Sequence, residues 1–148
     1  MLLFLGLIAL AIRRWRKRPE LAAEPEPDPP DVVALREWAA ARADKDLGDS
    51  VLALELSRVL RVYLEAICAW PATSRTTREI LGFLEQEGAG ARRLDVTDRM
   101  RTSRILDATD RLKFAREGGG EAFFVALDSD FQAVVDATRP LGMAEVRG

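Results

Sequence analysis

Five aspartates in the second half of the chain come closest to a catalytic or metal-binding constellation: Asp107, Asp110, Asp128, Asp130 and Asp136. Paired carboxylates can act as general acid and base, or hold a divalent cation. The spacing favours neither role, because Asp128 and Asp130 are two positions apart and cannot share one helix face. Asp107 and Arg111 have the i, i+4 spacing of an ordinary surface ion pair. We therefore predict no catalytic residues and no metal site.

The chain contains no histidine, so the commonest general base, metal ligand and pH-sensitive group is missing. The single cysteine, Cys68, lies in an apolar stretch, and we expect a buried, unreactive thiol. Gly118, Gly119 and Gly120 precede no Lys-Ser/Thr pair, so they predict a hinge and not a phosphate-binding loop. The sequence thus predicts a protein that is not an enzyme and binds no cofactor.

Two pairs of charged residues are better candidates, for partner binding. Arg58 and Arg61 lie one turn apart in one predicted helix, and Asp110 and Lys113 lie one turn apart in another. Either pair could form the edge of a protein interface, although a solvated helix face has the same pattern. A polar pocket joining all four would instead favour a ligand-binding or enzymatic domain. Nucleic acid is not an expected partner, because 22 basic and 24 acidic residues leave a formal net charge of −2.

The elements that position these residues are all predicted to be helices, because no segment alternates with period two. We expect five, at about 31–45, 49–70, 76–87, 95–115 and 121–138, packed as an antiparallel bundle. Asp31 is expected to cap the first, and Thr76 with Glu79 to form a capping box on the third. Arg61 and Glu65 are spaced for an ion pair.

The residues expected to face the core follow helical spacing. They are Val32, Leu35, Trp38 and Ala39 in the first helix; Leu52, Leu56, Val59, Leu60, Tyr63 and Ile67 in the second; Ile80, Phe83 and Leu84 in the third; Val96, Met100, Ile105, Leu106, Thr109, Leu112 and Phe114 in the fourth; and Phe123, Phe124, Leu127, Phe131, Val134 and Val135 in the fifth.

The N-terminal residues 1–18 predict a membrane anchor. An apolar run from Leu2 to Ile12 is followed by five basic residues and Trp15. Eleven helical residues rise only about 16 Å, against a hydrocarbon core of about 30 Å, so we expect the natural chain to begin upstream of Met1. A secretory signal, with cleavage near Leu21-Ala22-Ala23, would carry its cations before the apolar run. A core helix would carry polar residues on one face.

The position of the cations predicts the topology of the chain. Basic residues next to a membrane span remain on the cytoplasmic side, so we expect a single-pass protein of the bacterial inner membrane with a cytoplasmic C-terminal domain. Residues 19–30 hold five of the seven prolines and four acids, and predict an extended, disordered linker. The domain itself should span residues 31–148.

Four short stretches, in this order, carry a family resemblance: 56–64 (LSRVLRVYL), 71–81 (PATSRTTREIL), 110–115 (DRLKFA) and 137–140 (ATRP). They resemble small membrane-anchored helical proteins of bacteria that are encoded beside MoxR-type AAA+ ATPases and von Willebrand factor A proteins. They are also similar to the cytoplasmic tails of BatD-like proteins. The resemblance implies an accessory, protein-binding role beside such an ATPase system. The alternatives are a ligand-binding or enzymatic domain and a structural subunit of an envelope complex.

Overall fold

The computed structural model of the chain describes residues 26–86, 93–114 and 118–139. Within these residues the secondary structure is entirely helical: α2 (Pro30–Ala43), α3 (Asp49–Cys68), a short 3-10 helix η1 (Ala72–Ser74), α4 (Thr77–Glu85), α5 (Val96–Phe114) and α6 (Gly120–Thr138). The predicted all-α bundle of about five helices is confirmed for this part of the chain. The predicted anchor and the linker up to residue 25 lie outside it. None of the described helices has the length and apolar character needed to cross a membrane.

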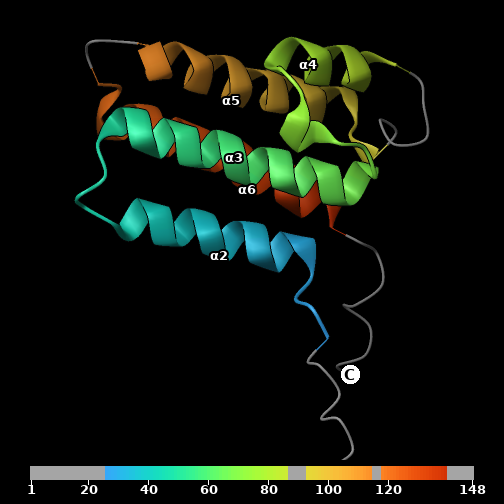
Figure 1. Cartoon of the computed structure of the whole chain (residues 1–148), viewed down its shortest axis with the longest axis horizontal. Coiled ribbons are helices and arrows are strands. Elements are labelled where there is room, and N and C mark those ends of the chain that lie inside the picture. Colours follow the sequence, from blue (N-terminus) through green and yellow to red (C-terminus); the bar gives the residue numbers. More distant parts are fainter. Residues whose placement is uncertain (1–25, 87–92, 115–117, 140–148) are drawn as a thin grey trace, which may run out of the picture.

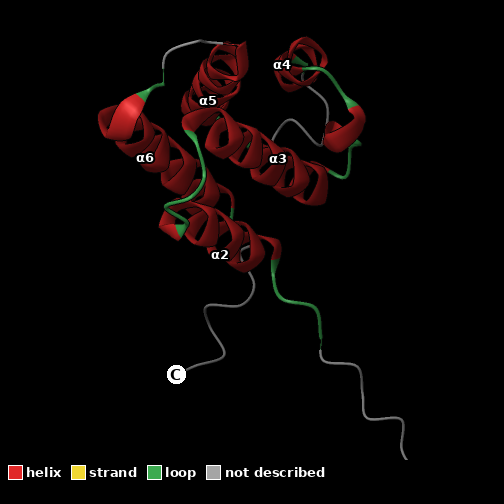
Figure 2. Ribbon diagram, turned by 60° about the vertical axis from the view of Figure 1, so that its left-hand side comes forward, coloured by secondary structure: helices red, strands yellow, loops and turns green. Residues whose placement is uncertain are grey.

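The helices are arranged in three layers around α3. Helix α2 lies on one side of α3 and α6, and α5 with α4 lies on the other side (Figures 1 and 2). Helix α3 packs against both α2 and α5, and α5 also packs against α6. Helix α3 occupies the central position because its buried residues cover much of its circumference, so it needs neighbours on several sides.

The core of the bundle is built mainly by α3 and α6. All six predicted core residues of α3 are buried, and so are five of the six predicted for α6, with Phe123 half-buried. The hydroxyl of Tyr63 is 2.7 Å from the Thr138 Oγ1 and donates to the carbonyl of Val135 at 3.3 Å. A large aromatic ring is thus buried while its polar atom remains hydrogen-bonded.

The predicted buried faces of α2 and α5 are partly wrong. In α2, Ala34 and Trp38 are buried, whereas Val32 and Ala39 are exposed and Leu35 is half-buried. In α5 the prediction holds for Ile105, Leu106, Thr109 and Leu112, but Val96, Met100 and Phe114 are exposed. The buried stripe of α5 includes polar residues: the Thr109 hydroxyl donates within its own helix to the Leu106 carbonyl at 3.0 Å, whereas the buried Thr102 Oγ1 has no hydrogen-bond partner among the described residues. Apolarity alone therefore misplaces the face.

The predicted helix starts are confirmed for α4 and corrected for α2. The Thr76 amide donates to the Glu79 carboxylate at 2.8 Å, and the Glu79 amide donates to the Thr76 Oγ1 at 3.3 Å, which completes the capping box. Helix α2 begins at Pro30, one residue earlier than expected, because proline suits the first helical position. Asp31 therefore caps nothing, and its carboxylate pairs with Arg139 at 3.3 Å.

The Asp31–Arg139 ion pair joins the beginning of α2 to the end of α6. At the other end of the bundle, the Ser50 hydroxyl donates to the Leu112 carbonyl at 3.4 Å, which places the last turn of α5 beside the first turn of α3. Helix α3 has 20 residues, so about 30 Å separate these ends. The last residue of α5, Phe114, therefore lies far from both ends of the described chain (Figure 1).

Candidate functional site

Three of the four predicted partner-binding residues lie in one hydrogen-bonded ring between α3, α4 and α5. The Lys113 Nζ donates to the Asp110 Oδ1 at 2.8 Å, within α5. The hydroxyl of Thr77, the first residue of α4, donates to the Asp110 Oδ2 and accepts from the Arg61 Nη2 at 2.9 Å. The Ser57 Oγ closes the ring, accepting from the Arg61 Nε at 3.2 Å and the Lys113 Nζ at 3.4 Å. We call these five residues the polar ring.

The polar ring keeps its carboxylate ionised. Burial acts to raise the pKa of Asp110, but the hydrogen bonds from Lys113 and Thr77 outweigh it, so this pKa lies below its ordinary value. Arg61 also donates to the carbonyl of Arg75, just before α4. The ring thus contains two cations and one carboxylate, all held by neighbouring groups. The polar ring therefore stabilises the packing of α3, α4 and α5 against one another.

The ring also corrects a predicted ion pair. Arg61 does not pair with Glu65, because its guanidinium points toward α4 and is occupied there. The Glu65 carboxylate instead accepts from the Thr73 amide at 2.9 Å and from the Thr73 hydroxyl, which lowers the pKa of Glu65. Two neighbouring side chains of α3 thus hold the connection to α4 from different sides.

Arg58 lies apart from the other three predicted residues. Its guanidinium contacts Glu55 at 3.0 Å and Glu37 of α2 at 2.9 Å. The hydrogen bonds that Arg58 donates to Glu37 and to Glu55 raise its pKa. Arg58 therefore links α3 to α2, whereas Arg61 links α3 to α4. The four residues do not line one pocket.

The aspartates considered for catalysis have separate partners. Asp130 pairs with Arg104 at 3.1 Å and Asp136 with Arg139 at 3.1 Å. The predicted side-chain pair of Asp107 and Arg111 is not formed, because the Arg111 Nε donates to the backbone carbonyl of Asp107 at 3.3 Å. The described residues contain no cluster of three or more metal-ligating side chains. Cys68 is buried as expected, and this burial raises the pKa of its thiol to about 11.

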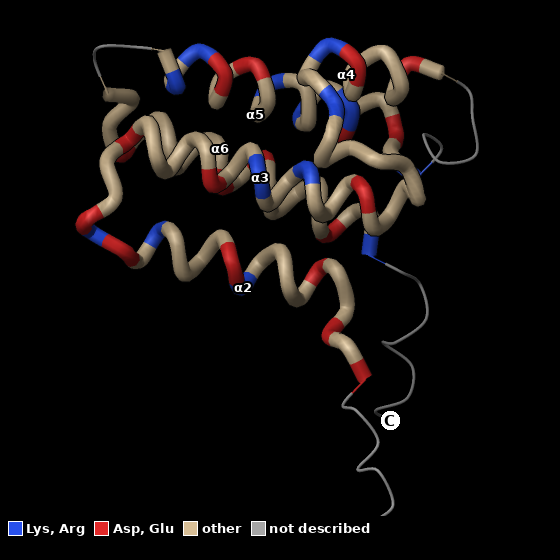
Figure 3. Tube along the Cα trace, in the orientation of Figure 1, with Lys and Arg blue, Asp and Glu red and all other residues tan. Residues whose placement is uncertain are grey.

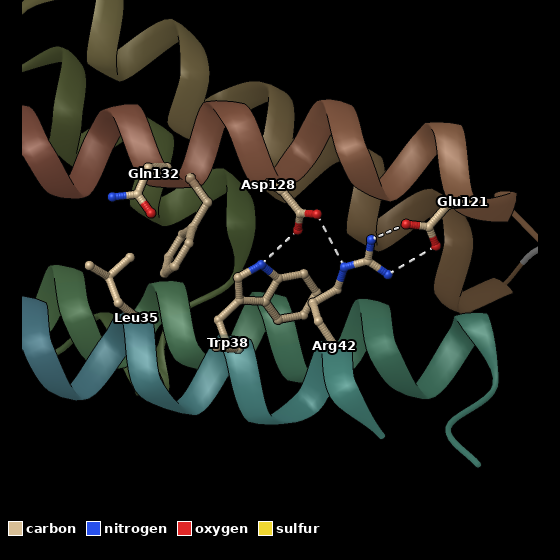
Figure 4. A pocket seen from close by; sticks show the side chains of 8 residues that line it. Leu35, Trp38, Arg42, Glu121, Asp128 and Gln132 are labelled. Atoms are coloured by element: carbon tan, nitrogen blue, oxygen red, sulfur yellow. Dashed lines mark hydrogen bonds and ion pairs between the residues drawn. The ribbon is translucent and has the colours of Figure 1, made fainter. Parts of the chain in front are cut away.

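A groove between α2 and α6, of about 540 Å³, was not predicted from the sequence (Figure 4). Its floor contains Trp38, whose indole Nε1 donates to Asp128 at 2.8 Å. The Arg42 guanidinium contacts Asp128 at 3.2 Å and Glu121 at 2.6 Å. The hydrogen bond from Arg42 lowers the pKa of Glu121. Because these polar groups bond to one another, the groove serves first as the joint between α2 and α6.

The sequence held a signal for this joint. Trp38 and Arg42 are one turn apart on α2, as are Asp128 and Gln132 on α6, and all four line the groove. Their pairing depends on how two helices far apart in the sequence are packed, which periodicity does not predict. Arg42 also lies over the ring of Phe124, 5.5 Å from its centroid.

An open hollow of about 750 Å³ lies at the last turns of α5, lined by Asp107, Asp110, Arg111 and Phe114. Phe114 is 88% exposed, the largest exposure among the bulky apolar side chains of the described residues. Asp110 belongs both to the lining of this hollow and to the polar ring, so hydrogen bonds from Thr77 and Lys113 fix one of the lining side chains. This hollow is the candidate functional site.

Comparisons with known protein families, with curated proteins and with solved structures find no match to this chain. Within the described residues, the protein is an all-α bundle that carries an exposed aromatic side chain, Phe114, next to the polar ring.

Proposed function

We propose that this chain is a non-enzymatic, membrane-tethered interaction module whose helical domain binds a protein partner in the bacterial cytoplasm. The observation that supports the proposal is the exposure of Phe114, 88%, at the last turn of α5. Exposed aromatic side chains with a polar rim are typical anchors of protein interfaces. Asp107 and Arg111 supply the rim, and Asp110 and Lys113 hold the last turn of α5 against α3 and α4.

The position of Phe114 fits a tethered module. The segment proposed to be the anchor precedes α2, whose first residues pair with the end of α6. Phe114 lies at the opposite end of the bundle, about 30 Å away along α3. A domain held by residues 1–18 and a proline-rich linker would thus offer Phe114 to the cytoplasm and away from the bilayer.

The partner class follows from the family resemblance. We propose a MoxR-type AAA+ ATPase or a von Willebrand factor A protein as the partner, with the chain as an accessory to that system. The rival class, a ligand-binding or enzymatic domain, would be favoured by a polar pocket shared by Arg58, Arg61, Asp110 and Lys113. Arg58 instead faces α2, and the hollow at Phe114 is lined by Asp110 but not by Arg61.

The proposal is tested by co-purification of the full chain, extracted from membranes in detergent, with the purified ATPase or von Willebrand factor A protein encoded nearest to it. We expect Phe114→Ala to abolish recovery of the partner. Val125→Ala is the matched control, because Val125 is also an exposed apolar residue but lies on α6. Equal recovery by Phe114→Ala and the unaltered chain would contradict the proposal, as would failure of the unaltered chain to bind either protein.

A further inference from the structure

Three residues on the outer face of α4 are of types that a helix ordinarily disfavours at their positions. Arg78 is the second residue and Glu85 the last, although helix dipoles favour acids at the start and bases at the end. Gly82 lies in the middle, where glycine is unfavourable relative to alanine. Departures from such local rules tend to mark functional positions.

The described part of the chain does not account for these three residues. A Cβ atom added at Gly82 would meet no atom within 4 Å, so no neighbour requires a glycine there. Arg78 and Glu85 are exposed, and neither forms an ion pair or side-chain hydrogen bond with another described residue. The capping box and the buried Ile80 and Leu84 hold α4 from its other face. No described residue therefore pairs with the charged ends of this face, which borders an open hollow of about 660 Å³ whose far wall is formed by Asp107 and Asp110 of α5.

We infer that this face binds a second copy of the same chain, with two α4 helices packed antiparallel about a twofold axis between Leu81 and Gly82. Arg78, Leu81, Gly82 and Glu85 have the spacing i, i+3, i+4 and i+7 of one helix stripe. In the antiparallel arrangement, Arg78 faces Glu85 of the second copy, and the reverse pair forms by symmetry. Leu81 lies over Gly82 of the second copy, where the missing side chain leaves room.

The surroundings of α4 suit this arrangement. A hollow of about 360 Å³ on one side is lined by Leu81, Leu84, Val96 and Met100 among others, and Val96 and Met100 are 70% and 62% exposed. Pairing would cover these apolar side chains. Both signs of charge occur along α4 and α5 (Figure 3), so neither helix presents a surface of one sign that would repel a second copy. Helix α2 lies on the opposite side of α3, away from the contact (Figure 2).

Charge reversal tests the twofold contact. The full chain is examined by sedimentation equilibrium in a density-matched detergent, as the unaltered protein, Arg78→Glu, Glu85→Arg and the double reversal. Each single change places like charges together at two symmetric positions, and we expect the dimer dissociation constant to rise about tenfold. The double reversal should restore the original value, because each new charge meets its opposite in the second copy. Arg36→Glu, on α2, is the control and should change nothing.

Gly82→Ala supplies a second measurement. Alanine favours the helix, so the thermal midpoint measured under dimer-free conditions should rise, while the added methyl group should weaken the dimer. Both reversals also improve the helix dipole, so circular dichroism should show undiminished helicity. A chain that is monomeric at all concentrations, a dimer that ignores the single reversals, or a double reversal without recovery would each overturn the inference. None of these results depends on Phe114, so the partner proposal is tested separately.

Discussion

At the scale of single residues, Asp110 couples ionisation to the packing of three helices. Its pKa is lowered in the folded state from an ordinary value of 3.8, so its contribution to stability is complete above that pH. The contribution is lost as the pH falls through the lower, folded pKa. We expect Asp110→Asn to lower the free energy of unfolding at neutral pH by about 1 kcal/mol, and to flatten its decline as the pH falls below 3.8.

Urea unfolding at a series of pH values measures this effect. Asp107→Asn is the control, because Asp107 is an exposed aspartate of the same helix whose carboxylate accepts a hydrogen bond from Ser103 alone among the described residues. Parallel curves for Asp110→Asn and the unaltered chain would show that the polar ring does not depend on the ionised carboxylate.

The polar ring was only half predictable from the sequence. Charge and spacing indicated Arg61, Asp110 and Lys113, because one-turn pairs of charged residues are easily recognised. Ser57 and Thr77 join them through single hydroxyl groups, and a hydroxyl on a helix carries no pattern that indicates a distant partner. Arg58 lies one turn before Arg61 but pairs with Glu37 of α2, because its partner depends on how α2 packs against α3, which residue spacing does not predict.

At the scale of elements, α4 depends on its cap. The helix has nine residues, and helices shorter than about 12 residues are marginal in isolation. Thr76→Ala removes the side chain that accepts from the Glu79 amide, and we expect a loss of about 1 kcal/mol in the free energy of unfolding. Thr76→Ser keeps the accepting oxygen and should retain most of the stability. Urea denaturation followed by circular dichroism compares the variants, and an unchanged Thr76→Ala midpoint would contradict the expectation.

The helices themselves were predictable because clear sequence signals mark where they begin and end. Proline, the capping box and glycine mark the ends, and α3 and α6 carry continuous apolar stripes, so their bounds and buried faces were predicted closely. The face of α5 was predicted only in part, since its buried stripe also contains Asp98 and Thr102, which were not expected there, while Phe114 is exposed. The short η1 after Pro71 was also missed, because a single 3-10 turn has no periodicity of its own.

At the scale of the whole molecule, the domain has two ends with different surroundings. The end that holds Asp31 and Arg139 receives the chain from the proposed linker, and the other end presents Phe114. Helix α4 lies on the side of α3 away from α2 (Figure 1). The hollow beside the outer face of α4 and the hollow at Phe114 share Asp107 and Asp110, so the proposed self-association face and partner site adjoin, while the proposed tether enters at the end that holds Asp31.

The proposed tether predicts how the full chain and a shortened chain distribute in cells. Residues 1–18 combine an apolar run with five cations, so both hydrophobic insertion and attraction to anionic lipids could hold the chain on a membrane. Salt screens the second contribution and not the first. We expect the full chain to sediment with membranes and to be released by detergent. It should resist extraction by 1 M salt, whose ionic strength is on the order of ten times the physiological value.

A chain of residues 19–148 should remain in the supernatant and keep a helical circular dichroism spectrum, because every described helix lies at or after Pro30. Fusions at the C-terminus report the orientation: green fluorescent protein should fluoresce and alkaline phosphatase should be inactive, since the cations retain the following domain in the cytoplasm. Release of the full chain by salt alone would reduce the N-terminal segment to a peripheral, electrostatic contact. An active phosphatase fusion would place the domain, and with it Phe114, on the other side of the membrane from any AAA+ partner.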